Sequence, residues 1–468
     1  MSSAQDIVPR VNKTSRSVSN SWTNNLSTSP TVAFHSSQTS NMVRRNTKPL
    51  QRFETKEVKV LLLENVNETG VDILRGQGYQ VETVKSSLSE NELIERISDI
   101  HVIGIRSKTK LTARVLNAAK NLLVIGCFCI GTNQVDLKTA ASHGIAVFNS
   151  PFSNSRSVAE LTLAEIVALA RQLGDRSMEL HKGIWNKVSA GCWEVRGKTL
   201  GIVGYGHIGS QLSVLAESFG LSVIYYDVIP LMGLGTAKQV DSLKTLLSSS
   251  DFVSLHVPEL AETKGMIGAE ELAAMRDGSY LINNARGSVV DIPALVNAIR
   301  SGKLAGAAID VYPHEPAGNG PYFNAQALDT WASDLQTLPN VLLTPHVGGS
   351  TEEAQSAIGV EVGHALVRYV NEGSTQGAVN MPEVNLRSLT MDEPDHARVI
   401  FIHKNVPGVL RNVNKVLENH NVDKQMTDSR GDVAYLMADV SGVTQEEMKT
   451  LYQSLEDLQS RIRTRILY

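Results

Sequence analysis

A glycine-rich turn between an apolar run and a helical run constrains the fold of this chain more than any other stretch. Residues 199–203 form a short apolar run typical of a buried strand. Gly204, Gly206 and Gly209 follow at G-x-G-x-x-G spacing, and residues 210–219 then take a helical pattern. These glycines allow a tight turn, a close approach of backbone N–H groups to a ligand, and close packing of helix on strand. The stretch therefore predicts an α/β fold with a phosphate-binding helix N-terminus.

The acid that follows this turn predicts which dinucleotide is bound. A second β-rich run at residues 221–226 ends in Asp227, eighteen residues after Gly209. A carboxylate at this place would accept hydrogen bonds from the adenosine ribose hydroxyls and would repel the extra phosphate of NADP. Because G-x-G-x-x-G alone is a weak signal, an ordinary βα turn is the alternative. With Asp227 in place, the sequence predicts NAD as the cofactor.

Length and composition indicate a globular, multidomain chain. Its 468 residues suffice for about three domains of ~150 residues each. A net charge of -4 argues against a general nucleic-acid binder, and no apolar run is long enough to predict a membrane span. Three cysteines make no disulfide framework, which favours a reducing compartment, and no cluster of ligands predicts a metal site. We therefore expect a cytoplasmic protein with no nucleic-acid or membrane partner.

The N-terminal segment, residues 1–54, differs from the rest in composition. It is rich in Ser, Thr and Asn, and between Met1 and Arg52 it has seven basic residues against one acid. This composition predicts a disordered basic tail, although it also overlaps with that of a transit peptide. Asp6 and Pro9 interrupt any early amphipathic helix. We therefore expect a cytosolic regulatory tail.

Two parallel-sheet domains and a small C-terminal module are predicted after residue 55. Apolar runs alternate with helical stretches, which is typical of a doubly wound sheet covered by helices on both faces. Strands are expected at 59–63, 80–84, 102–106, 122–127 and 145–148, then at 199–203, 221–226, 252–256, 280–283, 304–311 and 341–344. Long helices are expected at 155–173 and 352–371, a functional or inserted loop at 312–342, and a linker at 386–395. Residues 397–468 predict strand, helix, strand, strand, helix.

Three polar residues stand at predicted strand ends, where open α/β sheets bind ligands. They are Arg286, Glu315 and His346. Each of these residues alone is more often an ordinary loop residue. Together with a nicotinamide cofactor, the three could carry out a hydride-transfer reaction. A histidine can take the proton of a hydroxyl near neutral pH, a carboxylate can orient its ring, and an arginine can hold a substrate carboxylate. The sequence thus predicts the oxidation of a hydroxy acid.

Several segments resemble the D-isomer-specific 2-hydroxyacid dehydrogenases, and among them the branch that acts on 3-phosphoglycerate. The segments are residues 126–136 and 149–160, the glycine-rich turn, residues 284–287 and residues 344–351. The resemblance covers nearly everything after residue 55 and implies that Arg286, Glu315 and His346 are catalytic. It implies a discontinuous substrate-binding domain, 55–153 with 346–384, around an NAD-binding Rossmann domain, 154–345. The implied reaction is oxidation of (2R)-3-phosphoglycerate to 3-phosphohydroxypyruvate, the first step of L-serine biosynthesis, with reduction of 2-oxoglutarate to 2-hydroxyglutarate as a side activity.

The resemblance also implies contacts for cofactor and substrate. The NAD-binding positions are Gly204, Gly206, His207, Ile208, Gly209, Asp227, His256, Asn284, Ala285, Arg286, Asp310, His346, Gly348 and Gly349. Arg106, Ser107 and Lys187 are implied to bind the phosphorylated substrate, and Lys108 would add charge. A phosphorylated acid needs more positive charge around it than lactate does, although exposed basic residues are usually just solvated.

The C-terminal module, 396–468, resembles an ACT domain, a small α+β regulatory fold. Residues 403–410 look like its effector-binding turn, so His403 and Asn405 are expected to bind L-serine. Asp423 stands where the bacterial pattern has a third, asparagine ligand, which leaves the strength of serine inhibition open. The resemblance further implies a homotetramer.

Two other functions fit the same pair of α/β domains. One is a glyoxylate or hydroxypyruvate reductase, and the other is a non-enzymatic, NAD-sensing protein of the co-repressor type. The C-terminal module counts against both, and the basic loop at Arg106 counts against the reductase.

Overall fold

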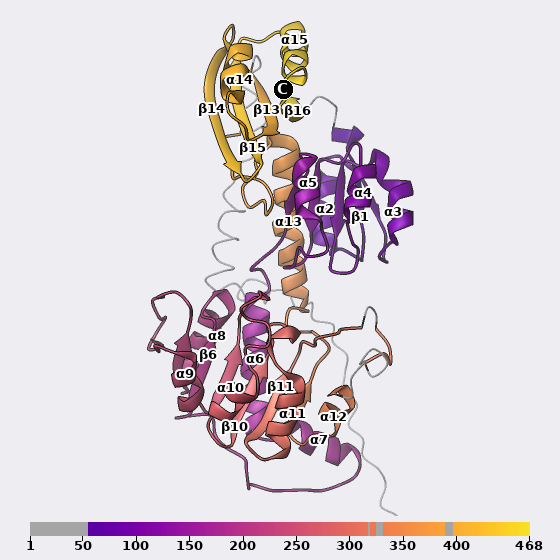
Figure 1. Cartoon of the computed structure of the whole chain (residues 1–468). Coiled ribbons are helices and arrows are strands. Elements are labelled where there is room, and N and C mark those ends of the chain that lie inside the picture. The colour runs from indigo at the N-terminus through magenta and orange to yellow at the C-terminus, as the bar shows by residue number, and fades with distance from the viewer. Residues whose placement is uncertain (1–54, 317–318, 324–330, 389–395) are drawn as a thin grey trace, which may run out of the picture. The chain divides into compact units, whose positions relative to one another are not determined.

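The computed structural model describes residues 55–316, 319–323, 331–388 and 396–468 (Figure 1). The predicted N-terminal tail, most of the predicted linker at 386–395 and part of the predicted loop at 312–342 lie outside these residues. The described chain forms three sheets, two of them parallel and one antiparallel, which confirms the predicted fold class.

The first sheet is parallel, with the strand order β2-β1-β3-β4-β5. Every residue of β3 and β4 is buried, as is required of a parallel strand covered on both faces. The strands are β1 (Lys59–Leu62), β2 (Gln80–Thr83), β3 (Val102–Ile105), β4 (Val124–Cys127) and β5 (Ala146–Phe148). Their connecting helices are α2 (Glu68–Gly76), α3 (Glu90–Arg96), α4 (Ala113–Ala118) and α5 (Leu137–Ser142).

A helix from far along the chain completes this first domain. Helix α13 (Glu352–Glu372) packs against α2 and β4 (Figure 1). Gly359 allows the two helices to approach closely, because a Cβ at this position would lie 2.4 Å from the Thr69 hydroxyl. After α13 the chain returns to the sheet edge, where Val379 donates a backbone hydrogen bond to Val147. The described chain therefore enters the first domain twice.

The second sheet is parallel, with the strand order β12-β11-β10-β9-β6-β7-β8. Its order reverses beside β6, and this is the point at which open α/β sheets leave a crevice for a ligand. The strands are β6 (Thr199–Val203), β7 (Ser222–Tyr226), β8 (Lys238–Gln239), β9 (Phe252–Leu255), β10 (Ser279–Asn283), β11 (Leu304–Ile309) and β12 (Val341–Leu343). Helices α6 (Ser155–Ala170), α8 (His207–Ser218), α9 (Leu243–Ser249), α10 (Ala269–Ala274), α11 (Ile292–Arg300) and α12 (Trp331–Thr337) surround it.

The helix predicted at 155–173 is shorter than expected. Gln172 adopts a left-handed φ of 49°, which ends the helical path of α6. A second helix that the sequence analysis did not predict, α7 (Leu173–His181), then begins. The short strand β8 and helix α12 were likewise not predicted, and α12 lies within the segment expected to be one long loop.

The third sheet is antiparallel, with the strand order β14-β15-β13-β16. Its strands are β13 (His396–Lys404), β14 (Asn421–Arg430), β15 (Val433–Ser441) and β16 (Arg461–Leu467), and its helices are α14 (Val409–Leu417) and α15 (Gln445–Glu456). The final strand β16 was missed by the sequence analysis, because its alternating Arg residues hide the apolar pattern. Within this domain the fully buried Arg398 is neutralised by Asp439, at 2.7 Å.

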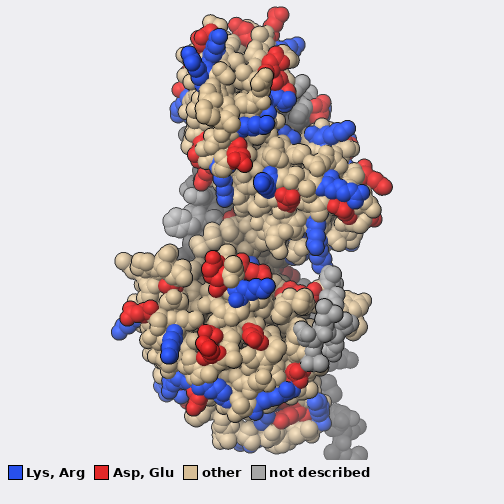
Figure 2. All heavy atoms as spheres, in the orientation of Figure 1, with Lys and Arg blue, Asp and Glu red and all other residues tan. Residues whose placement is uncertain are grey.

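The surface bears charges of both signs. On the face drawn in Figure 2, Lys and Arg side chains are interspersed with Asp and Glu side chains. No helix in the described part of the chain has both the length and the apolarity needed to cross a membrane.

Candidate active site

The glycine-rich turn joins β6 to α8, and each of its glycines meets a different environment. Gly204 has a φ of 90°, and a Cβ there would lie 2.6 Å from the carbonyl oxygen of His256. A Cβ on Gly209 would lie 2.4 Å from the carbonyl oxygen of Gly204. By contrast, nothing lies within 4 Å of a Cβ built on Gly206. The outer glycines are thus required by packing, while the middle one faces open space, as the approach of a pyrophosphate requires.

Two of the predicted cofactor positions, His207 and Ile208, begin α8 directly after this turn. At its N-terminus a helix has unpaired backbone N–H groups and a partial positive charge, both of which suit a phosphate. Asp227 follows β7 and is held beside the turn, because its Oδ2 accepts a hydrogen bond from the Tyr205 N–H at 2.8 Å. The residues present therefore fit a dinucleotide.

His256 follows β9 on the other side of the turn. Its Nε2 lies 2.8 Å from the Ser254 hydroxyl, and its Nδ1 is buried without a partner among the described residues. Burial lowers the pKa of this imidazole to about 4. His256 is therefore neutral at physiological pH and cannot repel a positively charged nicotinamide ring.

The His346 and Glu315 side chains form a pair, with Nδ1 of the imidazole 2.8 Å from Oε2 of the carboxylate. The hydrogen bond to Glu315 raises the pKa of His346 above its ordinary value, and the negative charges of Glu315 and Asp310 raise it further. Burial and the positive charge of Arg286 lower this pKa but do not outweigh the other effects. Desolvation acts to raise the pKa of Glu315, but its bonds to His346 and to the Tyr312 N–H, with nearby positive charge, lower it overall. Since Nδ1 is engaged, Nε2 is the nitrogen available to exchange a proton with a substrate.

A buried carboxylate holds the loop that carries His346. His346 has a left-handed φ of 54°, which is uncommon for a residue other than glycine. Asp310, only 1% exposed, stabilises this loop. Its Oδ1 accepts hydrogen bonds from the Thr344 hydroxyl at 2.7 Å and the Val347 N–H at 2.8 Å, and its Oδ2 accepts one from the Gly348 N–H at 2.8 Å. Sequence reasoning predicted Asp310 and Gly348 as cofactor contacts and missed this positioning role.

Arg286 lies in a turn after β10 that the preceding asparagines organise. The Asn283 side chain accepts from the Ala285 N–H at 3.2 Å and donates to the Arg286 carbonyl at 3.1 Å. A Cβ on Gly287 would lie 2.0 Å from the carbonyl carbon of Tyr312, so glycine is needed to bring this turn against the segment that leads to Glu315. Among the described residues the Arg286 guanidinium has no carboxylate partner, and its charge acts on both Glu315 and His346. The structure thus brings the three predicted catalytic residues together.

Another buried carboxylate organises the predicted substrate loop. Glu64, 8% exposed and with a φ of 65°, accepts hydrogen bonds from the backbone N–H groups of Arg106 at 3.3 Å, Lys108 at 2.9 Å and Thr109 at 2.7 Å. Sequence reasoning missed Glu64, although an acid directly after the apolar run at 59–63 was a usable signal. Ser107 and Lys108 are exposed on this loop.

The other predicted substrate residue lies in a different segment. Lys187 is exposed in the irregular stretch between α7 and β6, and it forms no ion pair with any described residue. Gly349, predicted to contact the cofactor, lies against Asn154, since a Cβ there would be 2.3 Å from its side-chain nitrogen.

The predicted effector residues lie at one end of the antiparallel sheet. His403 is the penultimate residue of β13, with its Nδ1 2.8 Å from the Lys404 carbonyl oxygen, and its Nε2 is buried without a described partner. Asn405 is exposed and donates to the Gly431 carbonyl at 3.0 Å. Asp423 pairs instead with His396, at the other end of β13. Within one chain, Asp423 therefore cannot join His403 around a ligand.

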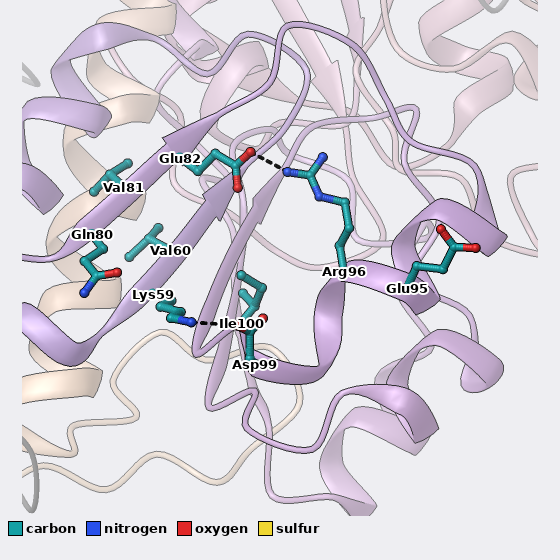
Figure 3. Close-up of a pocket in the computed structure, with 9 residues that line it drawn as sticks. All are labelled: Lys59, Val60, Gln80, Val81, Glu82, Glu95, Arg96, Asp99 and Ile100. Carbon is teal, nitrogen blue, oxygen red and sulfur yellow. Dashed lines mark hydrogen bonds and ion pairs between the residues drawn. The ribbon is translucent and has the colours of Figure 1, made fainter.

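A hollow of about 530 Å³ in the first domain contains none of the predicted site residues (Figure 3). Four of its charged side chains form two ion pairs, Lys59 with Asp99 at 2.6 Å and Arg96 with Glu82. These two cations are thus already paired with carboxylates.

Comparisons with known proteins show the family to which the chain belongs. Residues 163–348 match the family described as D-isomer specific 2-hydroxyacid dehydrogenase, NAD binding domain. The chain is 60% identical to D-3-phosphoglycerate dehydrogenase 2 of Saccharomyces cerevisiae, over 95% of each chain. It is 48% identical to D-3-phosphoglycerate dehydrogenase of Escherichia coli, over 89% of this chain and 98% of the relative.

A solved structure is also similar to this chain. D-lactate dehydrogenase of Aquifex aeolicus, complexed with NAD and lactic acid, aligns with 69% of this chain and all of its own at 29% identity and a TM-score of 0.59. The glycine-rich turn, Asp227 and the NAD-binding match identify the second domain as the cofactor domain of an NAD-dependent oxidoreductase. The chain belongs to the D-isomer-specific 2-hydroxyacid dehydrogenases, and within them to the D-3-phosphoglycerate dehydrogenases.

Proposed function

We propose that this protein oxidises the 2-hydroxyl of (2R)-3-phosphoglycerate to 3-phosphohydroxypyruvate, the first step of L-serine biosynthesis. The observation that carries the proposal is the pairing of His346 with Glu315 at 2.8 Å, with the Arg286 charge acting on both. In this arrangement His346 is the base, Glu315 orients it, and Arg286 is a cation that can bind the substrate carboxylate. All three lie at the carboxyl edge of a sheet whose glycine-rich turn fits a dinucleotide.

In oxidation, Nε2 of His346 accepts the proton of the 2-hydroxyl. Glu315 fixes the ring through Nδ1 and stabilises the imidazolium that forms. Arg286 holds the substrate carboxylate and, in the reverse direction, polarises the carbonyl oxygen at C2. NAD, when bound, supplies the hydride acceptor.

The residues that would hold NAD are those around the glycine-rich turn and those that follow β7, β9, β10, β11 and β12. They are Gly204, Gly206, His207, Ile208, Gly209, Asp227, His256, Asn284, Ala285, Arg286, Asp310, His346, Gly348 and Gly349. The neutral state of His256 and the open space at Gly206 support this set.

The substrate phosphate is assigned to Arg106, Ser107 and Lys187. Glu64 engages only backbone N–H groups of the loop, so it leaves the Arg106 side chain free to bind an anion. A cation that is not already paired binds a phosphate without first breaking an ion pair.

The domain plan we propose is a substrate-binding domain of residues 55–153 with 346–384, an NAD-binding domain of residues 154–345, and an ACT domain of residues 396–468. The packing of α13 on α2 supports the first of these. The unpartnered Nε2 of His403 supports an L-serine site with Asn405. Asp423 lies at the other end of β13 from His403, so within one chain it is not part of that site. We assign the enzyme to the cytoplasm. We also propose that it is a homotetramer.

The test is the initial rate of 3-phosphohydroxypyruvate reduction by NADH, followed at the cofactor's absorbance. The rate should exceed that with NADPH, and the His346→Ala variant should lose nearly all turnover while still binding NADH. Parallel assays with glyoxylate and 2-oxoglutarate rank the substrates, and added L-serine tests the effector site. A higher kcat/KM for glyoxylate, or full activity of the variant, would overturn the proposal.

A further inference from the structure

Beneath the Arg286 turn lies a buried carboxyl group that the mechanism does not use. Glu165 is on α6 and is 4% exposed, packed where the helix covers β10 and β11. Its Oε2 accepts a hydrogen bond from the Asn284 side chain, Nδ2, at 2.6 Å. The same Nδ2 donates to the Thr162 hydroxyl oxygen at 2.9 Å. The side chain of Asn284 thus anchors the turn that carries Arg286 to helix α6.

The two groups that share this hydrogen bond each leave an oxygen unused. Oε1 of Glu165 and Oδ1 of Asn284 are both buried, and neither has a hydrogen-bond partner among the described residues. Two buried acceptors on one pair of side chains are costly while both lack a proton. One proton on Oε1 satisfies both oxygens, since a carboxylic acid and a primary amide can form two hydrogen bonds in a ring.

We propose that Glu165 is a positioning residue that acts in its protonated form. Its carboxylic acid pairs with the Asn284 amide at two points, Nδ2–H to Oε2 and Oε1–H to Oδ1, and so fixes the turn that carries Arg286. The ionised form keeps only the first bond and places a carboxylate against an amide oxygen. This inference rests on the proposed function only in giving Arg286 the substrate carboxylate to hold.

Burial, and to a smaller extent a neighbouring carboxylate, favour the protonated form of Glu165. Burial raises the pKa of Glu165 to about 7, and the Asp310 carboxylate raises it against the effect of the Asn284 hydrogen bond. Asp310 faces Glu165 from the end of β11, and beyond it the Tyr312 phenol also interacts with Glu165. No cation of the described residues offsets these groups at Glu165. The proton on Glu165 is therefore lost within the physiological range of pH.

The experiment compares Glu165→Gln and Glu165→Leu with the wild type from pH 6 to pH 8. A glutamine keeps both hydrogen bonds at every pH, because its amide N–H replaces the acid O–H. A pKa near 7 means that the protonated fraction of Glu165 falls about tenfold across this range. We expect the ratio of the wild-type KM to the Gln-variant KM for 3-phosphohydroxypyruvate to rise by up to about tenfold, with little change in kcat. The Leu variant should have a raised KM at both pH values.

A second measurement does not depend on turnover. The infrared spectrum of the wild type at pH 6 should contain a carboxylic-acid C=O band that is about tenfold weaker at pH 8 and absent from the Gln variant at both pH values. Thr162→Val is the matched control, since it removes the other acceptor of Asn284 Nδ2 without removing a titrating group. It should change KM equally at both pH values and leave the infrared band in place.

The outcomes separate the two proposals. A KM ratio that is constant with pH, a missing infrared band, or a Gln variant as impaired as the Leu variant would overturn the role of Glu165. If the band behaves as expected while the wild type fails to reduce 3-phosphohydroxypyruvate, the proposed reaction is wrong and the acid–amide pair stands.

Discussion

Replacing Glu315 by Gln tests the central pair of the site. Glutamine preserves the size of the side chain and can still accept a hydrogen bond from Nδ1 of His346, but it removes the negative charge. A hydrogen bond to a charged partner contributes about 1.5–3 kcal/mol, and His346 and Glu315 are 50% and 36% exposed, so solvent screening favours the lower end. Because the neutral hydrogen bond that glutamine keeps contributes about 0.5–1.5 kcal/mol, the expected loss is about 1 kcal/mol, which is roughly a fivefold decrease in kcat/KM.

The pH profile of the reductive reaction gives the sign of the effect. Reduction requires protonated His346, so the rate falls as pH rises through the pKa of this imidazole. The hydrogen bond to Glu315 holds that pKa above its ordinary value. In Glu315→Gln the fall should move to lower pH, toward the ordinary histidine value of about 6.5, and the oxidative reaction should gain activity at lower pH for the same reason.

The control for this profile is Asp277→Asn, which removes a carboxylate whose side chain is 90% exposed and paired only with Lys303 in the described structure. Its profile should match that of the wild type. An unchanged inflection in Glu315→Gln, with an unchanged rate, would refute the assignment of Glu315 as the group that charges and orients His346.

Three further substitutions probe the cofactor turn and the His346 loop. Gly206→Ala places its Cβ in open space, so the thermal unfolding temperature should be unchanged while calorimetry shows weaker NADH binding. Gly209→Ala would place its Cβ 2.4 Å from the Gly204 carbonyl oxygen, so it should lower both the stability of the protein and its affinity for NADH. Equal NADH affinity in Gly206→Ala and wild type would contradict the role of the turn. Asp310→Asn places an amide N–H₂ against a backbone N–H that a carboxylate oxygen now accepts from. The free energy of unfolding in urea should fall by about 1–3 kcal/mol, and turnover should fall because the His346 loop is less well held. An unchanged unfolding midpoint would show that Asp310 does not hold that loop.

The predictions that succeeded depend on local patterns. Apolar runs between polar stretches marked most strands of the two parallel sheets, because a strand buried on both faces must be largely apolar. The glycine-rich turn was visible because its spacing is short. The meeting of Arg286, Glu315 and His346 followed from placing each at a strand end, since the carboxyl ends of parallel strands share one edge of the sheet.

The missed features depend on contacts between distant residues. The end of α6 at Gln172 results from a left-handed backbone that no glycine or proline announces. Strand β16 was hidden because Arg461, Arg463 and Arg465 interrupt its apolar residues. Glu64 and Asp310 act on backbone N–H groups of loops 42 and 37 residues further along the chain, and no local pattern reports which backbone a carboxylate will reach.

Buried carboxylates account for much of how this enzyme positions its cations and its base. Asp310 stabilises the strained loop at His346, and Glu64 stabilises the loop at Arg106. Glu165 anchors the turn at Arg286. In each case the acid binds backbone or amide N–H groups and not the functional side chain itself, so the cation or imidazole stays available for substrate. A carboxylate paired directly with Arg286 or Arg106 would compete with the carboxylate and phosphate of the substrate. Placing the acid behind the loop therefore orders the loop without occupying the side chain that has to bind.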